Sequence, residues 1–158
     1  MKAVIQRVSF SSVKCGEYYA QIDGGLNILL GIEKGDTLKE AQYIAQKAGG
    51  MRIFDDSEGK MNLAGDPAVH KILLISQFTL CADTRRGRRP SFINAMDFDQ
   101  AQGLYEQTAR LFEEMGFEVV CGVYGGDMEV TIVNDGPVTV VLDSREMKGG
   151  KGEAENGK

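Results

Sequence analysis

Apolar and polar side chains alternate at the start of the chain, and this alternation predicts a long β-strand over residues 2–13. Gly16 then marks a turn, and a second strand is predicted over residues 18–22. A hairpin turn at residues 23–25 leads into the apolar run 26–32, which is typical of a strand at the centre of a sheet. The start of the chain therefore predicts three consecutive strands.

Further apolar runs predict the remaining strands. Each run is short, and turn-forming residues separate it from the next. These runs cover residues 51–54, 69–78, 118–123, 128–133 and 138–142. Between the last two runs, Asn134-Asp135-Gly136 is typical of a hairpin turn, so the residues by themselves favour two strands joined by a turn.

Two helices are predicted from their start signals and periodicity. Residues 37–40 read Thr-Leu-Lys-Glu, the spacing of a capping box, and we expect a helix from there to about Ala48. A second helix, capped by Asp97 or Asp99, carries apolar residues on one face and ends at Gly116. Two helices are too few for a doubly wound parallel fold. We therefore expect a single compact α/β domain whose sheet is mostly antiparallel and barrel-like, with about two long helices packed on it.

Composition is that of a soluble globular chain with one domain. The 158 residues are 42% hydrophobic and 26% charged, and a chain of this length can bury a core without disulfides or metals. We assign residues 1–143 to the domain. Residues 144–158 are rich in glycine and charge, and we expect them to form a disordered tail.

Several features predict a cytoplasmic protein that does not engage a membrane. No apolar stretch approaches the ~18 residues that cross a bilayer, and the chain starts with a strand-like pattern rather than the apolar core of a signal peptide. The three cysteines, Cys15, Cys81 and Cys121, form no CxxC pair and leave an odd thiol, so a reduced compartment is the simplest interpretation. Each cysteine is more readily explained as buried filler than as a metal ligand.

The single histidine, His70, restricts the available chemistry. It comes directly before an apolar strand-like run, where a surface or edge position is the simplest interpretation. A role in a Ser-His-Asp triad is the alternative. One histidine cannot build a multi-histidine metal site, and we expect neither a metal ion nor a cofactor.

The net charge of −5 argues against indiscriminate binding of nucleic acid. Four arginines nevertheless fall within five residues, namely Arg85, Arg86, Arg88 and Arg89. Such a loop suits local binding of a tRNA phosphate backbone, because the guanidinium fork binds phosphate through two hydrogen bonds. A solvated loop and a salt-bridge site in an oligomer are alternatives that the sequence leaves open.

The segment Ser76-Gln77-Phe78-Thr79 follows an apolar run and is a candidate for catalysis. Ser76 and Thr79 are possible nucleophiles, but Gln77 cannot take a proton and no nearby base is in reach. The N–H groups of Phe78 and Thr79 instead suit an oxyanion hole. An ordinary strand end is the simpler alternative.

Gly136-Pro137 is the second candidate segment. Glycine lets backbone approach a ligand closely, and a bond that precedes proline can be cis at small cost. The hairpin turn described above is the alternative for these residues.

The chain resembles the D-aminoacyl-tRNA deacylase (D-tyrosyl-tRNA deacylase) family over nearly the full domain. Several independent segments match in the order and spacing of the family, and the residues after about Asp143 fall outside the match. The matching segments are Ile5-Gln6-Arg7-Val8, Arg52-Ile53-Phe54, Gly59-Lys60-Met61-Asn62, Ser76-Gln77-Phe78-Thr79-Leu80, Ala82-Asp83-Thr84 with Gly87 and Arg89-Pro90-Ser91-Phe92, and Asn134-Asp135-Gly136-Pro137-Val138-Thr139.

The resemblance implies a homodimer that binds the 3′ end of aminoacylated tRNA. It implies hydrolysis of the ester bond of D-aminoacyl-tRNA and of glycyl-tRNA, with rejection of L-aminoacyl-tRNA. The catalytic residues 76–79 of one subunit would face a cis Gly136-Pro137 dipeptide of the other. Arg7 would orient that dipeptide, and Met128 would line the pocket.

Two other interpretations compete with this one. A related branch of the superfamily has a trans Gly-Pro dipeptide and resembles Pro-Gln-Ala-Thr at the catalytic segment, so Phe78 argues against it. A non-catalytic nucleic-acid-binding module, using the arginines and the tail, belongs to a different class. The charges of the tail are nearly balanced, which makes it a poor nucleic-acid arm.

Overall fold

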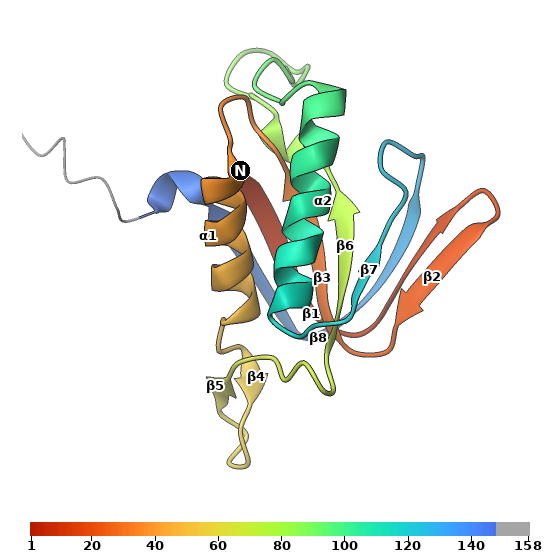
Figure 1. Ribbon diagram of the computed structural model, residues 1–158, viewed down its shortest axis with the longest axis vertical. Coiled ribbons are helices and arrows are strands. Elements are labelled where there is room, and N and C mark those ends of the chain that lie inside the picture. The colour runs from red at the N-terminus through yellow and green to blue at the C-terminus, as the bar shows by residue number, and fades with distance from the viewer. Residues whose placement is uncertain (148–158) are drawn as a thin grey trace, which may run out of the picture.

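The structure, a computed structural model, describes residues 1–147 and shows two long helices against a curved sheet (Figure 1). The strands are β1 (Lys2–Cys15), β2 (Tyr18–Ile22), β3 (Gly25–Gly31), β4 (Phe54–Asp55), β5 (Met61–Leu63), β6 (Lys71–Ser76), β7 (Val119–Cys121) and β8 (Glu129–Asp143). The helices are α1 (Leu38–Gly49) and α2 (Phe98–Glu114), with the short 3-10 helices η1 (Phe78–Cys81) and η2 (Ser144–Glu146). No helix in this part of the chain is long and apolar enough to cross a membrane.

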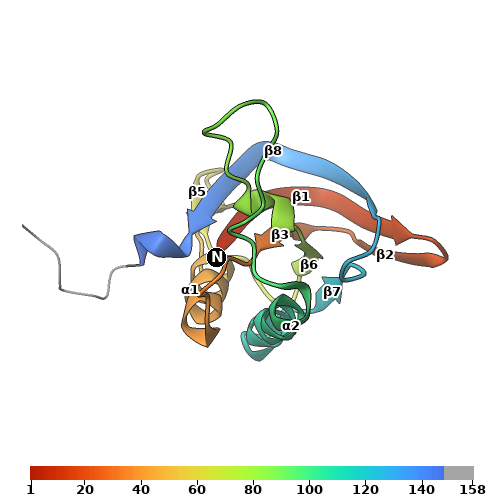
Figure 2. The ribbon, with the colours of Figure 1, turned by 90° about the horizontal axis from the view of Figure 1, so that it is seen from above.

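The main sheet is mixed and nearly closed. β1 lies at its centre and pairs antiparallel with β8 along one edge and with β3 and β2 along the other. β6 adds parallel to β3, and β7 adds parallel to β6. Seen from above, the sheet curls like an open barrel and both long helices lie on one side of it (Figure 2). The predicted fold, a barrel-like sheet with about two long helices, is confirmed.

Strand ends differ from the prediction at two places that matter for the site. β6 ends at Ser76, and Phe78 starts η1 instead of ending the strand. The two strands predicted over residues 128–133 and 138–142 are one strand, β8, so the predicted hairpin turn between them is wrong. β8 stays extended there because its partner β1 is itself continuous over 14 residues.

The segment after β8 stays with the fold for a few more residues. We predicted a tail from residue 144, but Ser144–Glu146 forms η2 and Ser144 is buried. The Ser144 hydroxyl accepts a hydrogen bond of 2.7 Å from the α-amino group of Met1, which also donates to Asp36 Oδ1 at 2.8 Å. Residues 148–158 of the predicted tail lie outside the described residues.

Apolar side chains fill both faces of the sheet, as β6 shows. Ile72 and Leu74 pack with the helices, whereas Leu73 and Ile75 pack with side chains of β1, β2 and β8. All four are at most 1% exposed. Alternate side chains of a strand point to opposite faces, so an uninterrupted apolar run requires cover on both. Burial of each such side chain contributes about 1.5–3 kcal/mol, which makes β6 central to the core.

The ladder between β1 and β8 is interrupted at Arg7. The strands pair on either side of the interruption, but Arg7 alone stands opposite residues 135–138 of β8. These extra residues form a bulge, and proline at 137 has no N–H to give to the ladder. The Gly136-Pro137 peptide bond within the bulge is cis. We call residues 135–138 the β8 bulge.

The predicted capping box at the start of α1 is confirmed. The Glu40 carboxylate accepts hydrogen bonds from the backbone N–H and the hydroxyl of Thr37, each of 2.7 Å. These hydrogen bonds lower the pKa of Glu40. Thr37 Oγ1 in turn accepts from the N–H of Lys39 at 3.3 Å, which satisfies a donor that has no partner inside the helix.

Replacement of Thr37 by alanine should destabilise the fold by about 1 kcal/mol, because the start of α1 loses its capping oxygen. Urea denaturation at one fixed protein concentration measures the free energy of unfolding. Thr37→Ser keeps the hydroxyl and should remain close to the unaltered chain. Equal stability of the alanine and serine variants would contradict the role assigned to the cap.

Candidate active site

A cavity of about 500 Å³ opens where the ends of β3 and β6 meet the start of α2. β3 and β6 are parallel neighbours, so their carboxyl ends lie at the same edge of the sheet. The loop after β7 and the first residues of β8 close the other side. The cavity is therefore built from four separate stretches of the chain around one sheet edge.

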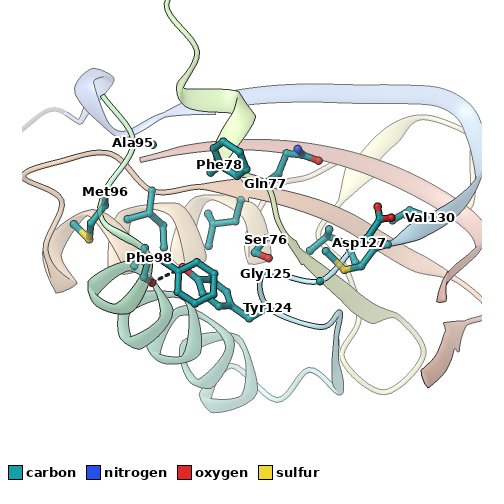
Figure 3. Close-up of a pocket in the computed structure, with 16 residues that line it drawn as sticks. Ser76, Gln77, Phe78, Ala95, Met96, Phe98, Tyr124, Gly125, Asp127 and Val130 are labelled. Atoms are coloured by element: carbon teal, nitrogen blue, oxygen red, sulfur yellow. Dashed lines mark hydrogen bonds between the residues drawn. The ribbon is translucent and has the colours of Figure 1, made fainter. Parts of the chain in front are cut away.

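The predicted catalytic segment lies at the rim of this cavity. Ser76, Gln77 and Phe78 line it, with Ser76 between the two walls in Figure 3. Thr79 is exposed and is not a lining residue, and its hydroxyl accepts a hydrogen bond from Gln77 Nε2. Three of the four predicted catalytic residues thus line the cavity, and the fourth, Thr79, is hydrogen-bonded to Gln77.

The turn from β6 into η1 leaves backbone N–H groups free. The N–H of Gln77 donates to the Leu30 carbonyl at 2.8 Å and so extends the β3–β6 ladder by one bond. The N–H groups of Phe78 and Thr79, the first two of η1, donate to no residue within 1–147. Two adjacent N–H groups without acceptors are suited to bind an oxygen that carries negative charge.

Aromatic rings form two opposite walls of the cavity. Phe78 lies on one side, and Phe98 and Tyr124 lie on the other (Figure 3). The centroids of the latter two rings are 4.8 Å apart, and the Tyr124 hydroxyl donates to the Phe98 carbonyl at 2.8 Å. Gly125 has φ +72°, and a Cβ there would lie 2.5 Å from the Phe98 ring, so this wall requires glycine next to Tyr124.

The sequence predicted little of the wall that Phe98 and Tyr124 form. Met128, which the sequence predicts as a lining residue, does line the cavity. Phe98, Tyr124 and Asp127 also line it, and Asp127 is the one charged side chain among the described lining residues. The Tyr-Gly-Gly-Asp pattern of residues 124–127 has the composition of an ordinary turn, and no signal in it indicates a binding wall.

No histidine or cysteine is among the described residues that line the cavity. His70 lies in a separate cavity, where its ring stacks on Phe54 at 4.0 Å and its Nδ1 accepts from the Asp66 N–H at 2.8 Å. Burial lowers the pKa of His70, so its ring is neutral at pH 7. Burial raises the pKa of the Cys81 thiol to about 11, so it stays protonated. His70 and Ser76 line different cavities, so a triad that combines them is excluded by position.

The predicted substrate-binding dipeptide Gly136-Pro137 does not line the cavity of its own chain. Both residues are exposed in the β8 bulge. Within residues 1–147, β8 pairs with β1 alone, so its outer edge is open, and Val133 and Val141 of the same strand are exposed. The fold therefore separates the two candidate segments within one chain.

Arg7 binds the β8 bulge and is itself 7% exposed. Its Nε donates to the Asp135 carbonyl at 3.1 Å, and its Nη1 donates to the Ile53 carbonyl at 2.8 Å. The carboxylates of Asp55 and Asp135 lie 3.3 and 3.4 Å from the guanidinium nitrogens. Arg7 is thus positioned to orient the bulge, and it does not line the cavity of its own chain.

The four arginines predicted to bind RNA lie outside the cavity, in the loop between η1 and α2. All four are exposed, and Arg85 forms an ion pair of 2.6 Å with Asp83. The two groups of candidate residues, the cavity and the arginines, are thus distinct parts of one end of the molecule.

Comparison with known sequences identifies relatives over nearly the whole chain. A family model described as D-Tyr-tRNA(Tyr) deacylase matches residues 4–143. A D-aminoacyl-tRNA deacylase of Dehalococcoides mccartyi is 51% identical over 147 residues, which cover 92% of this chain and 96% of that protein. A D-aminoacyl-tRNA deacylase of Clostridium botulinum is 47% identical over 145 residues, which cover 91% of this chain and 97% of that protein.

Solved structures agree with this relationship. A protein named c-Myc DNA Unwinding Element Binding Protein superposes with a TM-score of 0.84 at 37% identity, covering 90% of this chain and 98% of that one. A probable eukaryotic D-amino acid tRNA deacylase superposes with a TM-score of 0.74 at 14% identity, covering 89% and 97%, and supports the fold alone. The chain therefore belongs to the D-Tyr-tRNA(Tyr) deacylase family, and the reaction that this membership supports is deacylation of D-aminoacyl-tRNA, the hydrolysis of an ester bond.

Proposed function

We propose that the chain is a cytoplasmic homodimer that proofreads the chirality of aminoacyl-tRNA. It binds the aminoacylated 3′ end of tRNA and hydrolyses D-aminoacyl and glycyl esters to free tRNA and amino acid. It rejects L-aminoacyl esters. Each active site combines residues 76–79 of one subunit with Gly136-Pro137 of the other.

One observation carries this proposal, namely the separation of the two candidate segments within one chain. Residues 76–78 line a cavity, whereas Gly136 and Pro137 are exposed at a distance from it in the β8 bulge. A symmetric dimer in which each subunit inserts its bulge into the cavity of the other would complete both sites at once. The open edge of β8 and its exposed Val133 and Val141 support contact with a second copy.

The reaction requires a water molecule and a site for the developing oxyanion. Water attacks the ester carbonyl carbon and loses a proton, the carbonyl oxygen becomes negatively charged, and the bond to the ribose oxygen then breaks as that oxygen takes up a proton. The N–H groups of Phe78 and Thr79 can stabilise the oxyanion, and each such donor is worth about 3–4 kcal/mol. The neighbouring ribose 2′-hydroxyl organises the water, which accounts for a site without histidine. A covalent ester on Thr79 is the lesser variant, because its hydroxyl is engaged by Gln77.

Chirality is selected by exclusion. The carbonyl groups of Gly136 and Pro137 receive the ammonium group of the substrate. When the ammonium group and the ester are both fixed, the D- and L-enantiomers place their side chains in two different directions. An L side chain would collide with the backbone of the inserted dipeptide, whereas glycine has no side chain to collide. Arg7 keeps the dipeptide in orientation through its hydrogen bond to the Asp135 carbonyl.

A second candidate function is binding of nucleic acid without catalysis. It is favoured by the structural relative whose name describes binding to a DNA unwinding element, at 37% identity. The exposed arginines would provide the contacts, and binding would weaken steeply with salt. Turnover of an ester distinguishes the two functions.

The purified chain should deacylate D-tyrosyl-tRNA and glycyl-tRNA rapidly and leave L-tyrosyl-tRNA intact, because the proposed exclusion acts against the L side chain alone. Release of free amino acid from labelled substrates measures this directly. Turnover of no ester by folded protein would favour the binding function instead. Equal hydrolysis of the D- and L-esters would contradict selection by exclusion.

Gly136→Ala should lower kcat/KM for D-tyrosyl-tRNA by about 100-fold, the cost of a shift of about 1 Å at a reacting site. An added Cβ would lie 2.8 Å from Val138 Cγ2, and φ of +128° disfavours any side chain, so the bulge must move. The ratio of D to L activity should fall at least about tenfold.

Gly16→Ala is the matched control for the backbone strain of this substitution. Gly16 also has a positive φ, of +57°, but an added Cβ there meets nothing within 4 Å, so the D-to-L ratio should be retained. A folded Gly136→Ala variant with an unaltered D-to-L ratio would rule out the exclusion model.

Two variants that each have little activity alone should restore activity to each other if the sites are shared between subunits. Phe78→Pro removes a backbone N–H and the ring, and Gly136→Ala displaces the bulge, so a mixed dimer retains one intact site of two. Random mixing in equal amounts should recover about a quarter of the unaltered activity. Phe78→Pro mixed with a chain that carries both substitutions should recover none. Absence of recovery from verified mixed dimers would show that the site lies within one subunit.

A further inference from the structure

An exposed loop with four arginines stands beside the cavity and takes no part in the chemistry described above. Asp83 and Ser91 close the loop at its base, where their backbones exchange hydrogen bonds of 2.7 and 3.0 Å. Gly87, with φ +67°, turns the chain at the tip. Figure 2 shows this segment, drawn in green, projecting from the body of the molecule. A closed base and a tight tip gather the arginines on one small projection.

Arg85 differs from the other three arginines because a neighbour neutralises it. Its Nε and Nη2 donate to the Asp83 carboxylate at 2.9 and 2.6 Å, and this pairing holds the pKa of Asp83 well below its ordinary value. Arg86, Arg88 and Arg89 are exposed and form no hydrogen bond or ion pair with side chains of the described chain. Three guanidinium groups therefore face solvent with their full charge and all their donors free.

Phe92 connects the loop to the mouth of the cavity. Its ring meets Phe78 edge-on, with centroids 5.1 Å apart and planes at 72°. Phe78 lines the cavity, and Ala95 and Met96, which follow Phe92 in the chain, line it as well. The polypeptide therefore passes from the arginine loop directly into the cavity wall, so the loop adjoins the cavity on this side.

We propose that Arg86, Arg88 and Arg89 bind phosphate groups of the RNA strand whose 3′ end enters the cavity. This inference rests on the proposed function, which places an aminoacylated 3′ end there. A guanidinium group binds phosphate through two parallel hydrogen bonds, and three on one short loop can engage neighbouring phosphates of a single strand. The chain carries a net charge of −5, so association with a polyanion requires a local positive surface.

The test compares two substrates, D-tyrosyl-tRNA and D-tyrosyl-adenosine, which carries the same ester but no phosphate. The triple variant Arg86→Gln/Arg88→Gln/Arg89→Gln should lower the ratio of kcat/KM for the tRNA ester to that for the adenosine ester at least about tenfold. A plot of log kcat/KM for the tRNA ester against log salt concentration should become shallower by about 0.7 for each arginine removed.

A second triple variant, Lys39→Gln/Lys47→Gln/Arg110→Gln, is the matched control. It changes the net charge by the same amount at exposed positions of α1 and α2, away from the loop. Both the ratio and the salt slope should stay close to those of the unaltered chain. Thermal unfolding and sedimentation of both variants report whether the fold and the dimer persist.

Three outcomes would overturn the inference, and each has a different meaning. An unchanged ratio and salt slope in the folded loop variant would show that these arginines contact no phosphate. An equal loss of kcat/KM on both esters would show that the arginines stabilise the site itself rather than bind phosphate. If the variant also loses the dimer in sedimentation, the loop contacts a second copy of the chain. Failure of the unaltered chain to hydrolyse either ester would remove the proposed function first and this inference with it.

Discussion

The buried guanidinium group of Arg7 is the interaction on which the arrangement of the candidate site depends. A charge that is 7% exposed is costly unless it is paired and hydrogen-bonded, and Arg7 meets two carbonyl groups and two carboxylates. These groups come from the segment around β4 and from the β8 bulge, so one side chain joins three distant parts of the chain. The side chains of Asp55 and Asp135 are 54% and 59% exposed, so solvent screens their attraction to Arg7 and the two hydrogen bonds to carbonyl groups matter most.

The interruption at Arg7 explains how a sheet can present backbone to a ligand. On both sides of the interruption, β1 and β8 are paired, so the β8 bulge is attached to a paired strand at each end. A functional group mounted on a paired strand is held more precisely than one on a free loop. The same strand keeps its outer edge open, which is the edge that the proposed dimer would use.

The cavity and the arginine loop divide the proposed recognition of substrate between them. The cavity walls are mostly apolar and aromatic, and they suit the sugar, the base and the amino acid side chain of a substrate end. The arginines concentrate positive charge on one loop of a chain whose net charge is −5. Phe92 packs against Phe78 between the two, so the polar and apolar parts of the surface are continuous.

Local patterns determined the secondary structure and the class of fold from sequence alone. The alternation at residues 2–13 indicates β1, and the spacing of Thr37 and Glu40 indicates the start of α1, because both signals arise from neighbours in the chain. The candidate catalytic segment 76–79 was also predicted from sequence, through its resemblance to a known family, and three of its residues line the cavity. Residues 134–136 misled the prediction, since turn-forming residues can equally form a bulge when a long partner strand runs beside them.

Tertiary structure decided which residues from distant segments lie together at the cavity and around Arg7. Phe98, Tyr124 and Asp127 carry no local signal of a binding wall, and they line the cavity because β3 and β6 are parallel and end at the same edge. The alternation at residues 2–13 does not specify the partners of Arg7, and the fold buries it against segments 46 and 128 positions away. Sequence determines the conformation that neighbouring residues prefer, whereas contacts between distant residues depend on register and on which strands pair, which no local pattern specifies.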